Sequence, residues 1–296
     1  MTNKDRLDKL LVDRGLAETR QKAQAMIMAG LVFHGQVRLE KPGRMVPIDL
    51  PLIVEKPLPF VGRGGLKLEE ALDVFKIDTS GRICADIGSS TGGFTDCLLK
   101  KGAAKVFAVD VDIRQLDGRL RADPRVVTLE KNARFLEPGD FAETPSLVVM
   151  DVSFISVLKV MPALLRIIGD TIPVSEFSGD HNRESCIVSP IPPSQNRETG
   201  IASPILLSLI KPQFEAGKGQ IGKKGLVRDP AVHRDVLAQI TRGAADLGFR
   251  IHGLMSCSTR GQKGNQEFFG LWTPGGEPPT EETLASWIEA AVLVAL

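Results

Sequence analysis

Four charged residues lie at the ends of predicted structural elements in this sequence, and together they could carry out acid–base or charge-stabilising chemistry. Asp151 and Lys211 each directly follow an apolar run, Glu267 directly precedes one, and Lys67 lies in a helical pattern after the run GRGG. A charged residue that closes a buried parallel strand points into the crevice at the carboxyl edge of the sheet. Each residue alone is more often a surface charge. As a set, they are the candidates for a catalytic site.

A glycine-rich turn, DIGSSTGGFT at residues 86–95, lies between an apolar run and a segment with helical periodicity. This order is typical of a nucleotide site, because glycines permit a tight turn and the helix start offers free N–H groups. The spacing departs from the GxGxxG fingerprint, since Ser90 takes the place of the second glycine. Asp86 would repel a pyrophosphate and suits a ligand with a cationic amino group, such as S-adenosylmethionine. The candidate cofactor contacts here are Asp86, Gly88, Ser89, Ser90, Thr91, Gly92, Gly93 and Phe94.

Polar residues at the ends of later apolar runs extend this candidate cofactor site. Asp110 lies 22 positions after Gly88, where a carboxylate in such a fold can accept two ribose hydroxyls. Its neighbour Asp112 is a weaker candidate for the same role. Asn132 either reaches the adenine edge or stabilises a local turn. Asp151 is a candidate for contact with the cofactor as well as for catalysis.

The elements that must position these residues predict an α/β fold. Apolar runs alternate with helical patterns from residue 59 to 296, which indicates a doubly wound, mostly parallel sheet. The expected strands are 83–85, 106–109, 126–129, 147–150, 205–210 and 268–272. Residues 169–204 are rich in Pro, Ser and polar side chains, and we expect a mobile surface insertion there. An acidic start and an apolar stripe predict a packed helix from residue 280 onward.

Residues 1–58 predict a small α+β domain in front of this sheet. Two helices are expected, one over 6–16 and one that begins at the N-cap Thr19 and ends near Gly30. Short β-like pieces follow, and Pro57 and Pro59 mark a linker. A unit of this size is near the lower limit for an independent core.

The composition sets broader bounds on function. The net charge of +1 gives no global reason to expect nucleic acid, but residues 1–56 hold three more basic than acidic side chains. The four cysteines lie far apart without a CxxC pair, so neither a disulfide framework nor a metal site is expected. The sequence shows no signal peptide or membrane span, which predicts a soluble, cytoplasmic protein without stable membrane association.

The order of motifs resembles a known family. Residues 1–58 resemble an S4 RNA-binding domain, and residues 59–296 resemble a Rossmann-like, FtsJ-type ribose 2′-O-methyltransferase. With the runs GRGGLKL, DIGSSTGGFTD, MDVSFIS, IKPQFE, GLVRDP and GNQEFF, the chain is similar to the TlyA family, ribosomal RNA 2′-O-methyltransferases also called haemolysins. The insertion at 169–204 departs from the family pattern, in which this connection is short.

The resemblance implies a specific activity. Lys67, Asp151, Lys211 and Glu267 would form a catalytic tetrad, S-adenosylmethionine would be the cofactor without a metal, and cytidines of large or small subunit ribosomal RNA would be methylated. Transfer to a ribose hydroxyl needs an in-line approach and removal of the hydroxyl proton. Charges of both signs would surround Lys211: Lys67 and a nearby sulfonium are cationic, whereas Asp151 and Glu267 are anionic. We therefore expect both lysines to orient and activate the hydroxyl while both carboxylates hold the lysines.

An RNA-binding surface is expected mainly on the first domain. Its phosphate-binding candidates are Arg6, Lys9, Arg14, Arg20, Lys22, Lys41, Arg44 and, next to the linker, Arg63. Lys218, Lys223, Lys224 and Arg228, in the loop after Lys211, could extend the path toward the site. Without the family resemblance, a solvated helical face would be the simpler interpretation of so modest a charge excess.

Three alternatives belong to other classes of protein. A nucleotide-dependent oxidoreductase would share the fold, but Ser90 breaks the fingerprint and the chain has no Tyr for hydride chemistry. A membrane-active protein, as the haemolysin name suggests, would need a span or a basic amphipathic helix. A non-catalytic RNA-binding factor would keep the first domain without needing the tetrad.

Overall fold

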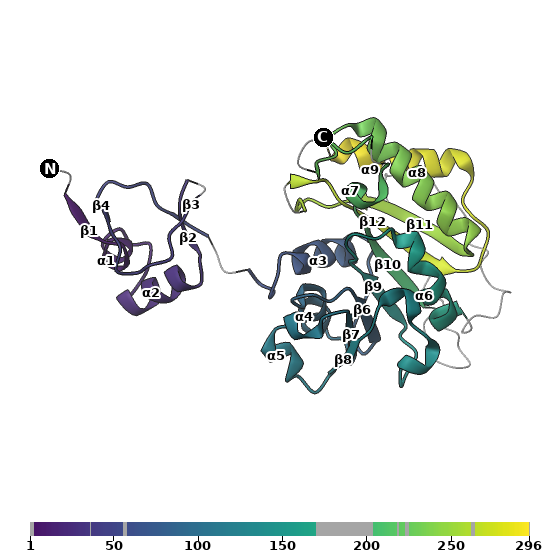
Figure 1. Ribbon diagram of the computed structural model, residues 1–296, viewed down its shortest axis with the longest axis horizontal. Helices are drawn as coiled ribbons and strands as arrows, with labels where there is room; N and C mark the ends of the chain where they lie inside the picture. Colours follow the sequence, from purple (N-terminus) through teal and green to yellow (C-terminus); the bar gives the residue numbers. More distant parts are fainter. Residues whose placement is uncertain are drawn as a thin grey trace. The chain divides into compact units, whose positions relative to one another are not determined.

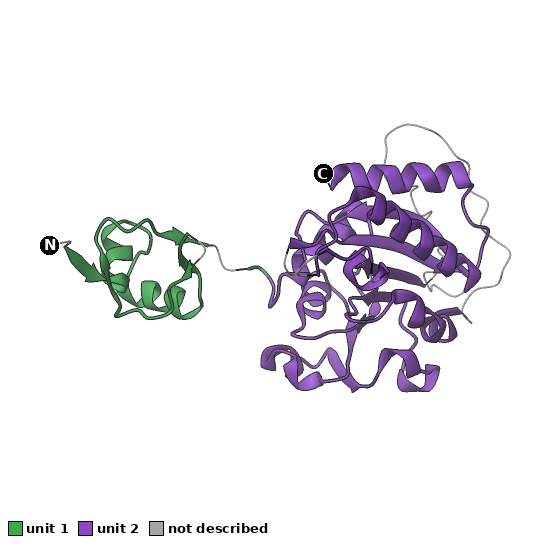
Figure 2. Ribbon diagram, turned by 45° about the horizontal axis from the view of Figure 1, so that its top comes forward, with its two compact units in different colours: residues 1–59 green, residues 60–296 purple. Residues whose placement is uncertain are grey.

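The computed structural model describes residues 3–35, 37–55, 58–169, 204–217, 219–222, 225–261 and 264–295. The chain forms two compact units, Met1–Pro59 and Phe60–Leu296 (Figure 2). The predicted insertion at 169–204 lies almost entirely outside the described residues, so its mobility stays a prediction.

The first unit is a helix pair with two small sheets. Its elements are β1 (Lys4–Arg6), α1 (Leu7–Asp13), α2 (Arg20–Met28), β2 (Val32–His34), β3 (Val37–Arg38), β4 (Met45–Pro47) and β5 (Ile53–Val54). The strands pair antiparallel, as β1–β4 and as β3-β2-β5. Thr19 caps α2 as expected, because its hydroxyl accepts from the Lys22 N–H at 3.2 Å. Leu7, Leu11 and Ile27 are fully buried and join the two helices in one core.

The second unit is built on a seven-stranded sheet with the order β11-β12-β10-β9-β6-β7-β8 (Figure 1). Its strands are β6 (Ile83–Ile87), β7 (Lys105–Asp110), β8 (Val126–Glu130), β9 (Leu147–Met150), β10 (Ile205–Ile210), β11 (Phe249–Ser256) and β12 (Phe268–Pro274). β12 runs antiparallel to both of its neighbours, whereas the strands from β10 to β8 pair in parallel. The predicted mostly parallel, doubly wound sheet is confirmed.

Helices cover both faces of this sheet. The helices are α3 (Gly64–Val74), α4 (Gly93–Lys100), α5 (Gly118–Arg121), α6 (Met161–Ile168), α7 (Pro212–Glu215), α8 (Pro230–Asp246) and α9 (Glu281–Val294), with 3₁₀ turns η1 (Ile113–Gln115), η2 (Ala133–Phe135), η3 (Pro138–Asp140) and η4 (Val157–Lys159). One core cluster joins α6, α8 and α9 to the sheet, and a second joins α3 and α4 to its other face. Successive strand residues alternate between these clusters: Val106 and Ala108 belong to the second, Phe107 and Val109 to the first.

The sequence analysis did not identify β11 as a strand. Its segment FRIHGLMS contains Arg250 and His252 and therefore lacks a continuous apolar run. The strand is nevertheless buried along most of its length, because β12, α8 and α9 pack on it. His252 tolerates this position since its Nε2 hydrogen-bonds to the Thr273 hydroxyl at 2.8 Å.

Candidate active site

The four predicted tetrad residues meet at the carboxyl edge of the sheet. β9 and β10 are parallel neighbours, so the residues that follow them, Asp151 and Lys211, lie side by side and form an ion pair. β12 runs the opposite way and pairs Phe268 with Ile210, which brings Glu267 to the same edge. The antiparallel direction of β12 explains why Glu267 precedes its strand whereas Asp151 and Lys211 follow theirs.

Lys67 reaches this edge from the first turn of α3. Its Nζ donates to Glu267 Oε2 at 2.5 Å, and the two side chains are only 9% and 3% exposed. A buried lysine or glutamate without a partner would be strongly disfavoured, and pairing offsets this cost. The arrangement therefore contains two lysine–carboxylate pairs, Lys67–Glu267 and Lys211–Asp151.

Neutral side chains complete the hydrogen bonding of both pairs. Lys211 Nζ also donates to the Ser153 hydroxyl at 2.8 Å, and Gln213 Nε2 donates to Glu267 Oε1 at 3.1 Å. A lysine ammonium has three N–H donors. Among the described residues, Lys211 has Asp151 as its ion-pair partner and Ser153 as its hydrogen-bond acceptor, so an N–H could still be offered to an acceptor on a substrate.

A cavity of about 120 Å³ lies between the glycine-rich turn and Asp151. It is lined by Gly62, Arg63, Gly64, Gly88, Ser89, Ser90, Thr91, Gly93, Phe94 and Asp151. The cavity is at the switch point of the sheet, where the chain leaves β6 toward β7 on one side and later returns to β9 on the other. Ligands of open α/β sheets bind at this point. The Ser89 hydroxyl is buried without a hydrogen-bond partner in the described part of the chain, so a bound ligand could satisfy it.

The glycines of the turn mainly allow neighbouring protein groups to approach the backbone closely. Gly88 and Gly92 have φ angles of +88° and +97°, which favour glycine. A Cβ at Gly88 would lie 2.5 Å from the Asp151 carbonyl oxygen, and one at Gly92 would lie 2.3 Å from Leu120. Ser90 adopts a φ of +48°, so the residue that breaks the fingerprint still takes a left-handed conformation.

Asp86 is fully buried and does not line the cavity. Its Oδ2 accepts from the Thr95 N–H at 2.9 Å and from the Thr95 hydroxyl at 2.6 Å. The carboxylate thus satisfies a free N–H in the first turn of α4, whose N-cap Gly92 has no side chain to do so. Burial raises the pKa of Asp86 to about 7. Contact of Asp86 with a ligand stays a prediction, and in this structure the residue organises the turn.

Asp110 and Asn132 also make local hydrogen bonds in this structure. Asp110 accepts from the Ser90 N–H at 2.9 Å and from the Asp112 N–H at 3.0 Å. Asn132 caps η2 by accepting from the Arg134 N–H at 3.1 Å, which is the turn-stabilising role left open by its sequence. Neither residue lines the cavity described above, so their contact with ribose and adenine stays a prediction.

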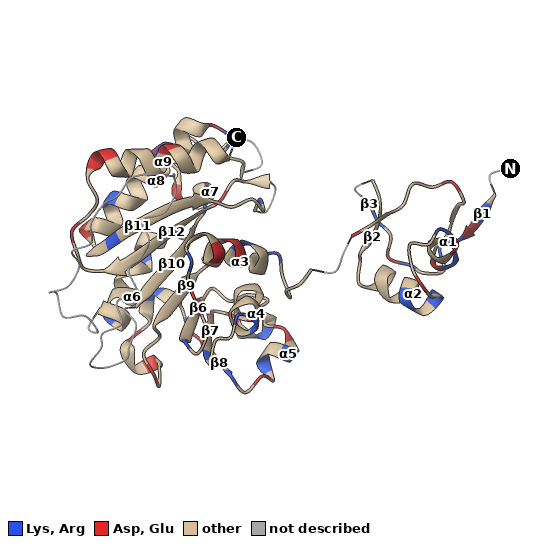
Figure 3. Cartoon of the chain, turned by 180° about the vertical axis from the view of Figure 1, so that it is seen from behind, with Lys and Arg blue, Asp and Glu red and all other residues tan. Residues whose placement is uncertain are grey.

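The expected RNA-binding residues of the first unit are largely paired within it. Asp8 is 0% exposed and accepts hydrogen bonds from Arg6, Arg20 and Gln24. Figure 3 shows acidic and basic segments interleaved on this unit. The sequence analysis missed Asp8, although its place beside Leu7 in the buried helical stripe is a signal that could have found it.

The remaining basic candidates differ in their surroundings. Lys9 pairs with Asp5 and Lys22 with Glu18, and Arg14 donates to the backbone carbonyls of Ile48 and Leu50. Lys41, Arg44 and Arg228 are exposed, and Arg63 is exposed at the cavity. Lys218, Lys223 and Lys224 lie outside the described residues.

Phe154 is a second residue that the sequence analysis missed. Its side chain is 89% exposed, and its φ of +64° is unusual for a bulky residue. Such strain costs about 1–3 kcal/mol and gathers at functional sites. Phe154 lies three residues after Asp151 in the chain. The centroid of its ring is 4.9 Å from the centroid of the Phe214 ring. The aromatic residue in each of the runs MDVSFIS and IKPQFE is the sequence signal for this pair.

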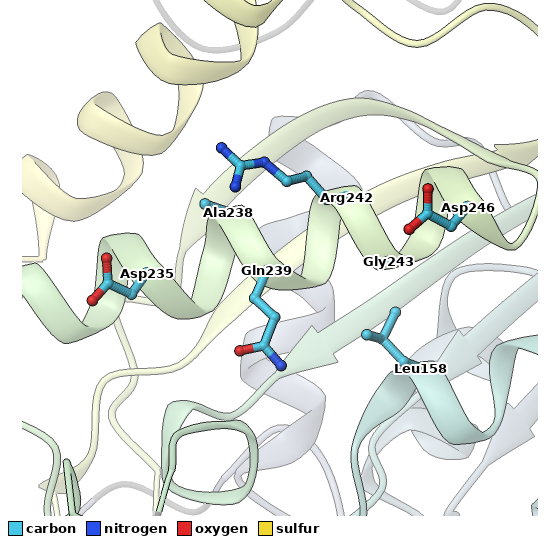
Figure 4. A pocket seen from close by; sticks show the side chains of 7 residues that line it. All are labelled: Leu158, Asp235, Ala238, Gln239, Arg242, Gly243 and Asp246. Carbon is cyan, nitrogen blue, oxygen red and sulfur yellow. The ribbon is translucent and has the colours of Figure 1, made fainter.

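A larger hollow of about 510 Å³ lies elsewhere, on α8 and η4 (Figure 4). Polar side chains of α8 and Leu158 line it, and no residue of the tetrad or of the glycine-rich turn contributes. We therefore place the chemistry at the smaller cavity. Among the described residues, no cluster of three or more His, Cys, Asp or Glu side chains could hold a metal ion. In the same part of the chain, no helix is both long and apolar enough to cross a membrane.

Comparison with known proteins assigns the class. The model of the FtsJ-like methyltransferase family matches residues 60–272, and that of the S4 domain matches residues 5–49. The chain belongs to the FtsJ-like methyltransferase family and carries an S4 domain in front of the methyltransferase fold. The resemblance stated from the motifs is thus confirmed.

Individual relatives show which proteins with an S4 or methyltransferase domain the chain is similar to. The chain is 43% identical to YqxC of Bacillus subtilis over 96% of this chain and 92% of the relative. YqxC is named as an rRNA methyltransferase. It is 39% identical to the 16S/23S rRNA (cytidine-2′-O)-methyltransferase TlyA of Mycobacterium tuberculosis, over 92% and 90% of the two chains. A solved structure from Streptococcus thermophilus, described as a hemolysin, has 36% identity and a TM-score of 0.66, with 98% and 96% of the chains covered.

Proposed function

We propose that this protein is an S-adenosylmethionine-dependent methyltransferase that modifies the ribose 2′-oxygen of cytidines in large or small subunit ribosomal RNA. The main support is the placement of two lysine–carboxylate pairs beside the cavity of the glycine-rich turn. The name of the M. tuberculosis relative supports ribosomal RNA, cytidine and the 2′-oxygen. The S4 domain supports an RNA acceptor, and we expect ribosomal subunits or ribosomes in the cytoplasm to be the partners.

The cavity residues fit such a cofactor. The unpartnered Ser89 hydroxyl could hydrogen-bond to it, the Asp151 carboxylate would attract its cationic amino or sulfonium group, and Arg63 could pair with its carboxylate. When bound, S-adenosylmethionine would supply an electrophilic methyl group at the edge of the sheet. The residues proposed to hold it are Gly88, Ser89, Ser90, Thr91, Gly92, Gly93, Phe94 and Asp151, with Asp86, Asp110 and Asn132 organising or extending this wall.

The tetrad would act on the acceptor. Lys211 directs an N–H toward the ribose 2′-oxygen and stabilises the negative charge that develops there as the hydroxyl proton passes to solvent water. The 2′-oxygen would form its bond to the methyl carbon as the bond from that carbon to the sulfonium sulfur breaks, so that the sulfur leaves as a neutral thioether. Asp151 and Ser153 fix the position of the lysine Nζ, and the buried Lys67–Glu267 pair shapes the adjacent wall. The exposed ring of Phe154 offers a stacking surface for an unpaired base beside the target ribose.

The test is transfer of labelled methyl from S-adenosylmethionine to free ribosomal RNAs, isolated subunits and intact ribosomes. The modified nucleotide is then mapped by alkaline cleavage of the RNA. Cleavage needs a free 2′-hydroxyl, so the bond after a 2′-O-methylated nucleotide resists it. We expect label at a cytidine ribose in at least one of these substrates. If no substrate takes up label while RNA is still bound, the protein is a non-catalytic RNA-binding factor and the proposal fails.

A further inference from the structure

The loop 151–157 and the segment 211–215 contact each other at three successive points. Lys211 Nζ donates to the Ser153 hydroxyl, the Phe154 ring packs on Phe214, and the Val157 N–H donates to Glu215 Oε1 at 2.9 Å. The two segments therefore lie side by side along their whole length. One carries Asp151 and the other carries Lys211, so their mutual position sets the geometry of that lysine–carboxylate pair.

Neither segment can hold this position by itself. α7 has only four residues, and so short a helix is unstable without tertiary contacts. The loop contains the left-handed Phe154, which persists only where neighbouring groups hold the backbone. The contacts between the two segments must supply that restraint.

Glu215 is the anchor at the far end of these contacts. Its carboxylate accepts from the Val157 N–H and forms a side-chain hydrogen bond with Ser156, the N-cap of η4. Glu215 is half-buried, and this burial raises the pKa of its carboxyl group. A carboxyl group in such a place is tolerated because the Val157 N–H and the Ser156 hydroxyl satisfy it.

We infer that Glu215 is a positioning residue for the active site: it holds the 151–157 loop against α7, so that Ser153 and Asp151 keep Lys211 aligned. This inference rests on the proposed function for its catalytic consequence. Glu215 does not touch the tetrad itself, and its effect passes through Val157 and the strained residue Phe154. The geometry depends on the reach of the side chain and on an acceptor oxygen, rather than on its charge.

Three variants separate these requirements. Glu215→Ala removes the acceptor, Glu215→Asp keeps the charge but shortens the reach, and Glu215→Gln keeps both the reach and an acceptor for the Val157 N–H. We expect kcat for methyl transfer to fall about 10- to 100-fold in the first two variants, because small displacements of reacting groups are costly. We expect the Gln variant to stay within a few-fold of the wild type. The dissociation constant for S-adenosylmethionine should change little in all three, since Glu215 does not line the cavity.

Hydrogen exchange gives a readout that is independent of catalysis. In the Ala and Asp variants the amides of residues 153–157 should exchange at least about tenfold faster, because Val157 loses its acceptor, while those of β6 and β7 stay protected. Glu289→Ala is the matched control, since it removes another carboxylate, one that pairs with Arg234 on the surface. Its exchange in the loop and its kcat should match the wild type.

The outcomes distinguish this inference from the proposed function. Unchanged exchange at residues 153–157 in Glu215→Ala, or a Gln variant as impaired as the Ala variant, would overturn the positioning role. Faster exchange throughout the unit would show that Glu215 stabilises the fold in general, which also overturns it. If the wild-type protein transfers no methyl group to any RNA, the proposed function fails. The effect of Glu215 on kcat then fails too, whereas its effect on the loop is still tested by hydrogen exchange.

Discussion

The two units of this protein use buried charge in different ways. In the first unit a single buried carboxylate, Asp8, accepts hydrogen bonds from Arg6, Arg20 and Gln24. In the second unit both members of the Lys67–Glu267 pair are buried. The second unit also has Lys211, which retains a donor beyond its protein partners.

The difference lies in whether the protein uses all the hydrogen-bonding capacity of the buried group. Asp8 is surrounded by donors from its own unit, so it stabilises the packing of α1 on α2 and leaves the outer faces of the arginines exposed. Lys211 has fewer partners among the described residues than it can bind, so it could direct an N–H to a ligand at the edge of the sheet. A saturated buried charge is structural, whereas an unsaturated one paired with a residue of the cavity wall, as Lys211 is with Asp151, is a candidate for chemistry.

The largest expected effect is the loss of this unsaturated group. Lys211→Ala should reduce methyl transfer by about 10³-fold or more, because the group that orients and stabilises the 2′-oxygen is gone. Affinity for S-adenosylmethionine, measured by calorimetry, should stay within a few-fold. Arg242→Ala, an exposed basic residue on α8, serves as the control and should leave both quantities unchanged. Loss of cofactor binding in Lys211→Ala would instead place this lysine in the cofactor site.

Removing the saturated charge should affect stability rather than chemistry. Asp8→Ala leaves Arg6, Arg20 and Gln24 without their shared acceptor, and a hydrogen bond to a charged group contributes about 1.5–3 kcal/mol. For a unit of this size, that loss is enough to unfold it. Hydrogen exchange should show unprotected amides in α1 and α2 with β6 and β7 unaffected, and Asp5→Ala, at an exposed pair, should behave as the wild type. A folded first unit in Asp8→Ala would contradict the structural role.

The pH dependence of stability should reveal the buried carboxyl of the second unit. The pKa of Asp86 is raised from its ordinary value of 3.8 to about 7, so the folded state holds a proton that the unfolded state releases. The contribution of Asp86 to stability is therefore fully present below pH 3.8 and is lost as the pH rises through 7. The free energy of unfolding of Asp86→Asn, measured with urea, should increase relative to that of the wild type as the pH rises from 4 to 7. A constant difference between the two proteins over this range would show that Asp86 is ionised in the folded state.

The smallest effect concerns the exposed charges of the first unit. Arg6 and Arg20 are tied to Asp8, so replacing them changes stability along with charge. Lys41→Glu and Arg44→Glu test RNA binding without breaking an ion pair that the structure shows. Each should weaken binding to ribosomal RNA several-fold and lower the slope of log affinity against log salt by about 1 for each lost phosphate contact. Arg242→Glu makes the same charge change outside this unit, and an equal effect there would argue against a specific surface.

The meeting of Asp151, Lys211 and Glu267 could be predicted because each borders an apolar run, whereas the assignment of Lys67 rested on its helical pattern and on the family resemblance. Parallel strands end at the same edge, so Asp151 and Lys211 could be placed together from their positions alone. The role of Asp86 was harder to predict. A turn carboxylate suggests ligand contact, but β6 is buried on both faces, and the side chain of Asp86 is enclosed with the start of α4.

The sequence by itself determined the order of the two domains, the alternation of strands and helices, and the chemical types available at the sheet edge. These follow from local periodicity and from the motifs. Only the tertiary structure decided how these charges pair: Lys67 contacts Glu267, 200 residues further along the chain, and Arg20 of α2 reaches Asp8 of α1. It also decided which of those charges keep a free donor. The reason is physical: burial and hydrogen-bond saturation depend on neighbours in space, and spacing along the chain does not specify those neighbours.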